Sequence, residues 1–320
     1  MIKIFKDILE ESLETFFFIG YNRPGYLVRR NFWEFPEINF SMKGKICLVT
    51  GGNSGIGKAS VQGLAGLGAD VIFLCRDKEK AEETIRETQL IHPSASVQYE
   101  EVDLSLRSSI KKFTDVFIKK YSHLDVLVNN AGVFLEDKKI SPEGLETTFA
   151  TNTLAYHLLS RYLEPLLRGN GNARIINVTS GGMYLTRLDV NNLQFLNGNY
   201  SGLKAYAQSK RAEVDLSLLW SKYYAKKGVT VNMVHPGWVD TPSLSQALPY
   251  FYTFMKPFLR TPKEGADTII WMASKPDWVP WDTSKLYFDR EERKLNILPN
   301  TNTPNGEKQI LWDYLEALVI

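Results

Sequence analysis

In four places in this chain, a tyrosine stands four positions before a lysine. In this arrangement the tyrosine can act as a proton donor. On a helix this spacing puts both side chains on one face, where the ammonium group can favour the phenolate form of the tyrosine. The pairs are Tyr200/Lys204, Tyr206/Lys210, Tyr223/Lys227 and Tyr252/Lys256. Because the chain has 15 tyrosines, some of these matches arise by chance, and sequence context must separate them.

Sequence context separates one pair from the other three. Gly202 divides the first pair, which places it in an expected loop. The third pair falls at the frayed end of a helix before Gly228, and the fourth lies in an aromatic segment outside the alternating elements. Only Tyr206 and Lys210 begin a helix that follows a strand ending in serine, Ser180. Ligands of parallel sheets bind near such strand ends, so this pair is the predicted acid–base pair.

A glycine-rich segment, VTGGNSGIGKA, contains the end of the first apolar run and the start of an expected helix. Gly51, Gly55 and Gly57 form a G-x-x-x-G-x-G pattern. Glycines at these positions let the chain turn sharply and let the backbone approach a pyrophosphate at the positive end of the helix. A tight turn without a ligand would carry a similar pattern, but the position between strand and helix favours a dinucleotide site.

The residues after the next apolar run indicate which dinucleotide binds. An acidic side chain there accepts the ribose 2′-hydroxyl of NAD, whereas an arginine can pair with the 2′-phosphate of NADP. Arg76 comes first and Asp77 second, so NADP (NADPH) is predicted and NAD is less favoured. Asp77 could also hydrogen-bond a ribose or cap the following helix. Asp103, after the third apolar run, is a candidate adenine contact or an ordinary helix cap.

Short apolar runs alternate with longer helical patterns from residue 43 onward. Strands rich in Val, Ile and Leu and separated by helices form parallel sheets that are covered on both faces. We therefore predict an α/β fold, a single doubly wound Rossmann-fold domain over 43–290 with a parallel sheet of about seven strands. Long helices are expected over 143–168 and 204–226. Residues 1–42 would form an N-terminal amphipathic extension, and 291–320 a loop and a short helix.

The composition is that of a soluble globular protein, because 44% of the 320 residues are hydrophobic and 23% are charged. A net charge of +2 gives no electrostatic preference for nucleic acid, so no nucleic-acid partner is expected. Cys47 and Cys75 each lie in an apolar run, which favours two reduced thiols and an intracellular location. The four histidines show no metal-ligand spacing, so no metal site is predicted.

The first twenty residues have helical periodicity, with Phe5, Leu9 and Leu13 on one face. Charged residues interrupt this stretch, so neither a signal peptide nor a transmembrane span is expected. An amphipathic helix packed on the domain is the favoured interpretation. Peripheral contact with a membrane is the alternative, although the polar face of this helix is acidic rather than basic. The expected location is therefore cytoplasmic or peripherally membrane-associated.

Several motifs, in the same order along the chain, resemble the short-chain dehydrogenase/reductase family over about 43–288. TGGNSGIG resembles the glycine motif of that family, NNAG at 129–132 its fourth-strand motif, YAQSK its catalytic tyrosine–lysine motif, and HPG at 235–237 the turn after its sixth strand. Within the family, the segments VTGGNSGIGKA, CRD, TSGGM and HPGWVDTP are most similar to the member-twelve-like dehydrogenase/reductase subgroup, as is the N-terminal extension.

The resemblance implies a complete set of site residues. Tyr206 would exchange the proton, and Ser180 would orient the substrate oxygen. Lys210 would hold the nicotinamide ribose, and the backbone of Asn152 would support a water that relays protons from Lys210. The implied cofactor-binding residues are Gly51, Asn53, Ser54, Gly55, Ile56, Gly57, Arg76, Asp103, Leu104, Asn130, Ala131, Gly132, Tyr206, Lys210, Pro236, Gly237 and Thr241.

Two segments are expected to line the substrate site: 181–200, a longer loop than compact family members have, and 238–262. The second is rich in aromatic residues and leucine, which suits a lipophilic carbonyl or alcohol such as a retinoid, a steroid or a fatty aldehyde. The same rings could instead pack on the domain, a membrane or a second subunit. Helices 143–168 and 204–226 resemble the dimer surface of the family, so a homodimer is a further expectation.

A different class of function remains open at this point. The chain could be a non-catalytic NADP-binding scaffold or sensor that acts through its terminal extensions. A scaffold has no physical need for Ser180, Tyr206 and Lys210 together, whereas an oxidoreductase that moves a hydride between a nicotinamide and a carbonyl or alcohol needs all three. The sequence therefore favours an NADP-dependent enzyme.

Overall fold

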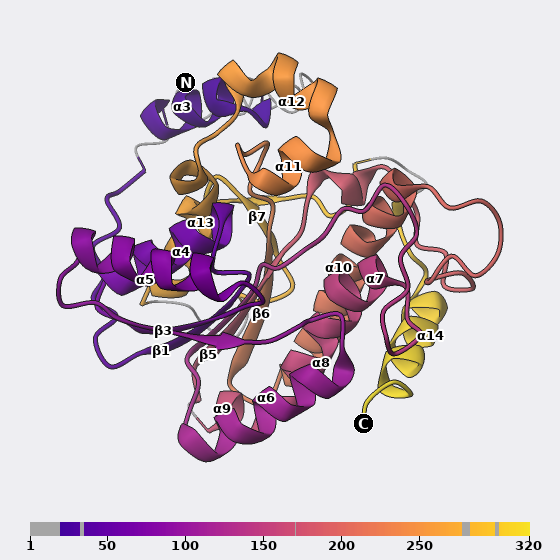
Figure 1. The fold of residues 1–320 in the computed structure, drawn as a ribbon, viewed down its shortest axis with the longest axis horizontal. Helices are drawn as coiled ribbons and strands as arrows, with labels where there is room; N and C mark the ends of the chain where they lie inside the picture. Colours follow the sequence, from indigo (N-terminus) through magenta and orange to yellow (C-terminus); the bar gives the residue numbers. More distant parts are fainter. Residues whose placement is uncertain (1–19, 33–34, 170, 277–281, 298–300) are drawn as a thin grey trace.

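The computed structural model describes residues 20–32, 35–169, 171–276, 282–297 and 301–320, and its centre is an eight-stranded sheet (Figure 1). The strand order is β3-β2-β1-β4-β5-β6-β7-β8, and only the last pair is antiparallel. The strands are β1 (Ile46–Thr50), β2 (Asp70–Cys75), β3 (Ser96–Glu101), β4 (Val126–Asn129), β5 (Ala173–Val178), β6 (Val229–Val234), β7 (Leu286–Phe288) and β8 (Glu291–Arg293). The predicted doubly wound α/β fold is confirmed. The short edge strand β8 was not anticipated, because three residues are too few to show a pattern.

Helices cover both faces of the sheet, and each face has its own apolar core (Figure 1). One face carries α4 (Gly55–Gly66), α5 (Lys78–Ile91) and α13 (Pro262–Ser274), and the other carries α6 (Arg107–Lys120), α8 (Ala155–Tyr162) and α10 (Gly202–Tyr224). β5 and β6 are buried along their whole length between these layers. Burial on both faces is typical of the central strands of a parallel sheet, and here it extends to their polar residues Arg174, Asn177, Thr230 and Asn232.

The strand order reverses at β1, which pairs with β2 on one side and with β4 on the other. In open α/β sheets, ligands bind in the crevice outside the carboxyl ends of the strands at this point. The segments that follow β1, β4, β5 and β6 carry most of the residues predicted for the site. Both cysteines lie in strands here, and each is a buried free thiol.

The helix expected over 143–168 is divided into four pieces. They are α7 (Thr147–Phe149), a π-helix (Ala150–Leu154), α8, and α9 (Glu164–Arg168). The first begins at residue 147 because the carboxylate of Glu146 accepts hydrogen bonds from the backbone N–H groups of Thr148 and Phe149, as an N-cap does. Pro165 lies in the first turn of α9, where its missing N–H is tolerated, and marks the break from α8.

The segments after β5 and β6 form short helices around the carboxyl edge of the sheet. A 3₁₀ turn (Gly181–Tyr184) follows β5, and α10 then begins after Ser201, whose hydroxyl accepts a hydrogen bond from the N–H of Lys204. After β6 come α11 (Pro242–Ala247), α12 (Pro249–Met255) and a 3₁₀ turn (Lys256–Phe258). None of the residues in these last three elements is buried. We call the segment 242–258 the lid.

The C-terminal helix α14 (Asn305–Glu316) packs beside α8 and α10 (Figure 1). Leu311 and Leu315 are completely buried there, and the indole of Trp312 lies 4.9 Å from that of Trp220, centroid to centroid. The predicted C-terminal helix is therefore present, and it begins and ends four residues earlier than the apolar pattern over 309–320 suggested. It covers part of the helical face that resembles the family's dimer surface, and the homodimer stays a prediction.

The described part of the N-terminal extension is packed on the domain through α3 (Arg23–Phe32). Arg29 is buried and contacts the carboxylate of Asp289 at 3.1 Å, while Tyr21 stacks on Phe288. The amphipathic face predicted over residues 5–17 lies outside the described residues, so its proposed membrane contact stays a prediction. Within the described residues, every helix is too short or too polar to cross a membrane.

Candidate active site

Tyr206, Lys210 and Ser180 come together at the carboxyl end of β5. The helix α10 presents both Tyr206 and Lys210, and the ammonium nitrogen of Lys210 lies 5.6 Å from the centre of the Tyr206 ring. Ser180 follows β5, and its hydroxyl accepts a hydrogen bond from the N–H of Gly182. A methyl group on Gly182 would lie 3.5 Å from the Tyr206 ring, so the turn that follows Ser180 lies beside this ring.

Lys210 is buried, and two hydrogen bonds hold its ammonium group. It donates to the carbonyl oxygen of Val178 at 3.1 Å and to a carboxylate oxygen of Glu213 at 2.8 Å. Burial alone would lower the pKa of Lys210, but the negative charge of Glu213 and the Tyr206 oxygen outweigh it and raise this pKa. Lys210 is therefore an ammonium group at neutral pH, as a group that favours a nearby phenolate must be.

Asn152 lies in the π-helix and is completely buried beside this group. Its side chain donates to the carbonyl of Val133 and to the hydroxyl of Ser209, both at 2.9 Å, and accepts from the N–H of Val133 at 2.8 Å. A methyl group on Gly132 would lie 3.3 Å from the Lys210 nitrogen and 3.6 Å from the Asn152 oxygen. The segment after β4, the π-helix and α10 therefore converge at one point, and only glycine leaves it open.

The glycine loop has the geometry of a phosphate cradle. Gly51 and Gly55 adopt positive φ angles of 67° and 51°, and a methyl group on Gly57 would lie 2.1 Å from the carbonyl oxygen of Gly51. Only glycine fits such positions. Ser54 caps α4 without a side-chain hydrogen bond, so the first N–H groups of this helix remain available to an anion.

Thr50 joins the glycine loop to the segment after β4. Its hydroxyl accepts hydrogen bonds from the N–H groups of Asn130 and Ala131, at 2.8 and 2.9 Å, and the Asn130 amide donates back to the Thr50 carbonyl. Thr50 was not among the site residues predicted from the sequence. Its position at the end of a strand, directly before the glycines, could have indicated that it belongs to the site. These contacts position Asn130, Ala131 and Gly132 beside the cradle, and the cradle fits a dinucleotide.

Arg76 and Asp103 lie near each other past the ends of β2 and β3. The Arg76 guanidinium is 3.9 Å from the Asp103 carboxylate, and 64% of the Arg76 side chain is exposed. Asp77 instead caps α5, because its carboxylate accepts a hydrogen bond from the N–H of Lys80, which lowers the pKa of Asp77. Of the two alternatives weighed for Asp77, the structure therefore contains the helix cap. Leu104, beside Asp103, is buried.

The lid begins directly over the glycine loop. The Thr241 hydroxyl caps α11 by accepting from the N–H of Leu244, and a methyl group on Gly55 would lie 2.9 Å from the Thr241 methyl. Asn53 and Ile56, in the loop below, are only partly buried. Pro236 and Gly237 lead into the lid, and Gly237 has a φ of 80°.

His235 has a structural role. Its Nδ1 accepts a hydrogen bond from the N–H of Gly237 at 2.8 Å, and its ring packs 4.7 Å from that of Tyr21. Burial, together with the nearby Arg260, lowers the pKa of His235 to about 3. The imidazole is therefore neutral throughout the physiological range and supports the turn before the lid.

The other three tyrosine–lysine pairs have partners that account for them. Tyr200 donates to the buried carboxylate of Glu146, and Tyr223 donates to Glu164 beneath the ammonium group of Lys227. Tyr252 donates to Asp240 in the lid. Tyr206 instead lies beside the turn that follows Ser180, and Tyr206/Lys210 stays the predicted acid–base pair.

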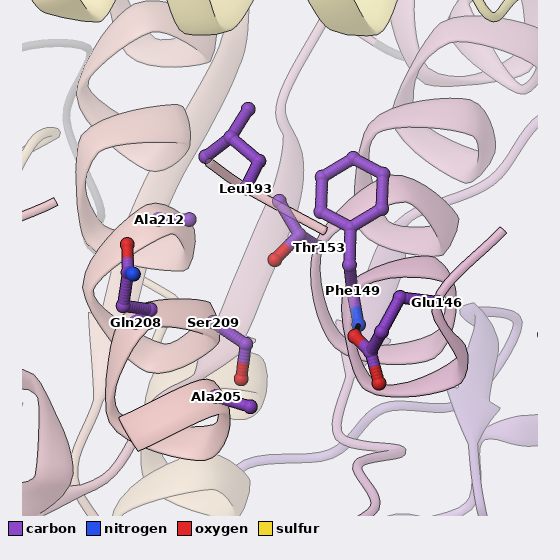
Figure 2. A pocket seen from close by; sticks show the side chains of 8 residues that line it. All are labelled: Glu146, Phe149, Thr153, Leu193, Ala205, Gln208, Ser209 and Ala212. Atoms are coloured by element: carbon purple, nitrogen blue, oxygen red, sulfur yellow. Dashed lines mark hydrogen bonds between the residues drawn. The ribbon is translucent and has the colours of Figure 1, made fainter. Parts of the chain in front are cut away.

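Figure 2 shows a cavity behind the site, between the π-helix and α10. Thr153, Gln208 and Ser209 line it, and its volume of about 10 Å³ admits no more than one water. This cavity is therefore too small to hold a substrate. Among the described residues, no group of His, Cys, Asp and Glu is arranged to hold a metal ion.

Comparisons with known proteins agree with this geometry. The family model described as short chain dehydrogenase matches residues 45–249. Dehydrogenase/reductase SDR family member 12 of Bos taurus is 34% identical over 303 residues, covering 93% of each chain. Retinol dehydrogenase 14 of Homo sapiens is 33% identical over 301 residues, covering 87% of each chain.

Solved structures show the same architecture. A crystal structure of a protein from Mycobacterium paratuberculosis superposes with a TM-score of 0.71 at 25% identity, covering 88% of this chain and 96% of that one. The NADP complex of Pseudomonas aeruginosa RhlG has a TM-score of 0.62 at 25% identity, covering 78% of this chain and 96% of that one.

Proposed function

Because the chain belongs to the short-chain dehydrogenase/reductase family, we propose that it is an NADP-dependent oxidoreductase acting on a carbonyl or alcohol group. The observation that carries this proposal is the convergence of Ser180, Tyr206 and Lys210 near a glycine loop that can hold a pyrophosphate. A binding scaffold would need the loop but not the three polar side chains. The coenzyme, when bound, would supply the hydride as NADPH during reduction and accept it as NADP⁺ during oxidation.

The protein's own residues then manage the proton. Tyr206 donates its phenolic proton to the substrate oxygen during reduction and removes it during oxidation. The ordinary pKa of a phenol is about 10, so a neighbouring positive charge is needed to make the phenolate accessible. Lys210 supplies that charge and also holds the nicotinamide ribose. The Ser180 hydroxyl orients the substrate oxygen toward Tyr206.

The preference for NADP rests on the end of β2. Arg76 is free enough to turn toward a 2′-phosphate, because most of its side chain is exposed and its contact with Asp103 is long. Asp77, which could have accepted a ribose hydroxyl, is engaged as a helix cap. The NADP complex of RhlG supports the same choice by similarity.

A lipophilic substrate is the best match to the lid. Its aromatic side chains include Tyr250 and Phe254, which are 92% and 82% exposed, while Phe251 packs against Trp238 at 4.8 Å. Such a surface gains free energy by covering apolar ligand. The retinol dehydrogenases among the relatives act, by their names, on a lipophilic alcohol, which supports a retinoid, steroid or fatty aldehyde as the substrate class.

The decisive experiment compares two tyrosines in the same segment. NADPH oxidation is measured with a panel of lipophilic carbonyls for the wild type, Tyr206→Phe and Tyr200→Phe. Loss of general acid catalysis should lower kcat by about 10²–10⁴-fold in Tyr206→Phe only, since Tyr200 is bonded to Glu146.

Two other results would change the proposal. If Tyr200→Phe were inactive and Tyr206→Phe active, Tyr200 rather than Tyr206 would be the proton donor, and the proposed assignment would be wrong. NADPH binding to the wild type without turnover of any carbonyl or alcohol would favour the scaffold.

A further inference from the structure

Glu213 is a buried acid that sequence analysis did not select. It lies on α10, three residues after Lys210, and its side chain has no exposed surface. One carboxylate oxygen lies 2.8 Å from the Lys210 ammonium nitrogen, and the other has no hydrogen-bond partner among the described residues. An ionised carboxylate in such a place is costly unless a cation compensates it, so its one cation partner matters.

Few other groups surround this pair. The titratable side chains that interact with the pair are Tyr206 on α10 and Tyr156 on α8. Thr179, which follows β5, uses its hydroxyl proton on the carbonyl of Lys210 at 3.0 Å. The charge that Tyr206 senses from its own helix is therefore that of Lys210, reduced in part by that of Glu213 when both are ionised.

We propose that Glu213 is a positioning residue that keeps Tyr206 in its proton-donating phenol form by neutralising part of the charge on Lys210. The proposal rests on the proposed function, because it assigns a role to a residue behind the same proton donor. Without the carboxylate, the full ammonium charge would act on the phenol and favour phenolate. With it, Tyr206 keeps its proton to higher pH, which suits reduction of a carbonyl.

The effect depends on pH in a definite direction. Burial raises the pKa of Glu213 to about 7, although Lys210 acts to lower it. The carboxylate is thus ionised above neutral pH, where it offsets part of the charge on Lys210. Below neutral pH it is protonated and offsets none of that charge.

The test is an ultraviolet titration of tyrosinate in the nucleotide-free protein. Subtracting the same curve for Tyr206→Phe isolates the titration of Tyr206, in both the wild-type and the Glu213→Gln background. Glutamine keeps the shape of the side chain and removes its charge, so we expect the midpoint to fall by about one pH unit. The acidic limb of the pH profile of kcat/KM for alcohol oxidation should move in the same direction.

Two further variants separate charge from structure. Glu213→Asp keeps the charge and should leave the midpoint near that of the wild type. Asp215→Asn neutralises another buried carboxylate of α10, one paired with Arg211, and should cost stability without moving the Tyr206 midpoint.

An unchanged midpoint in Glu213→Gln would overturn the proposal. A raised midpoint would overturn it as well, because it would make Glu213 the counter-ion that keeps Lys210 charged. The titration needs neither nucleotide nor substrate, so it can succeed or fail independently of whether the protein turns over a carbonyl.

Discussion

At the scale of single side chains, Arg76 is the residue to which we assign the proposed preference for NADP. We expect Arg76→Ala to weaken NADPH binding by about 10–100-fold, the loss of a charge-assisted hydrogen bond, and to leave NADH binding nearly unchanged. Fluorescence titration with both nucleotides measures this difference. Arg86→Ala, on the exposed side of the following helix, is the control and should change neither affinity. An equal loss of affinity for NADPH and NADH would show that Arg76 does not bind the 2′-phosphate.

The spacing between tyrosine and lysine does not by itself identify an acid–base pair. Four pairs share one spacing, and only the environment of each phenol separates them: Tyr206 adjoins the Ser180 turn, whereas Tyr200 bonds Glu146. The pair beside Ser180 could be located because its strand and helix were both recognisable in the sequence, and its role in proton transfer stays a prediction. Glu213 could not, because its spacing from Lys210 is common on helix surfaces and only burial makes it significant.

At the scale of elements, Glu143 holds the start of α6 from a distant loop. Its carboxylate accepts hydrogen bonds from the N–H groups of Arg107 and Ser108 and from both of their side chains. Burial would raise the pKa of Glu143, but these bonds together lower it from 4.5 to about 2. The lowered value means that the stabilisation is present above pH 4.5 and is lost as pH falls toward 2.

Glu143→Gln should therefore lower the free energy of unfolding at pH 7 by about 1–2 kcal/mol. The difference from the wild type should shrink as pH falls from about 4.5 to about 2, because the wild type loses its carboxylate there. Urea unfolding at several pH values measures both effects. Glu83→Gln, on the exposed face of α5, should show neither. A difference that persisted at pH 2 would argue against the carboxylate cap.

The π-helix and the other divisions of the helix expected over 143–168 could not be predicted from the hydrophobic pattern of the sequence. The apolar pattern over 143–168 is continuous, so it predicted one helix. The observed divisions arise from Glu146 capping a later start, from Asn152 bonding the segment after β4, and from Pro165. The first two causes depend on contacts rather than on periodicity.

At the scale of the whole molecule, a buried ion cluster joins the N-terminal extension to the end of the sheet. Asp289 receives hydrogen bonds from Arg260 at 2.5 and 2.8 Å and from Arg29 at 3.1 Å, and all three side chains are buried. Burial would raise the pKa of Asp289, but the two arginines lower it. Its stabilisation is therefore present above the ordinary pKa of 3.8 and is lost as pH falls below it.

Asp289→Asn should lower the free energy of unfolding at neutral pH by about 3–5 kcal/mol, because it removes the carboxylate that is paired with two buried arginines. Asparagine tolerates the positive φ of 51° at this position, so the loss reports charge rather than backbone strain. Thermal or urea unfolding measures it. Arg23→Ala removes the half-exposed pair with Glu264 from the same extension and should cost at most about 1 kcal/mol. Equal costs for the two variants would contradict a special role for the buried cluster.

The sequence alone determined the α/β fold, the glycine cradle and the pairing of Tyr206 with Lys210, because each depends on residues within a few turns of one another. Backbone preferences and side-chain periodicity act over that range. Only the tertiary structure revealed the hydrogen bond from Asn130 to Thr50, the packing of α14 on α10, and the ion cluster at Asp289. These features join segments up to 260 residues apart, and no local pattern specifies which distant surfaces will meet and exclude water.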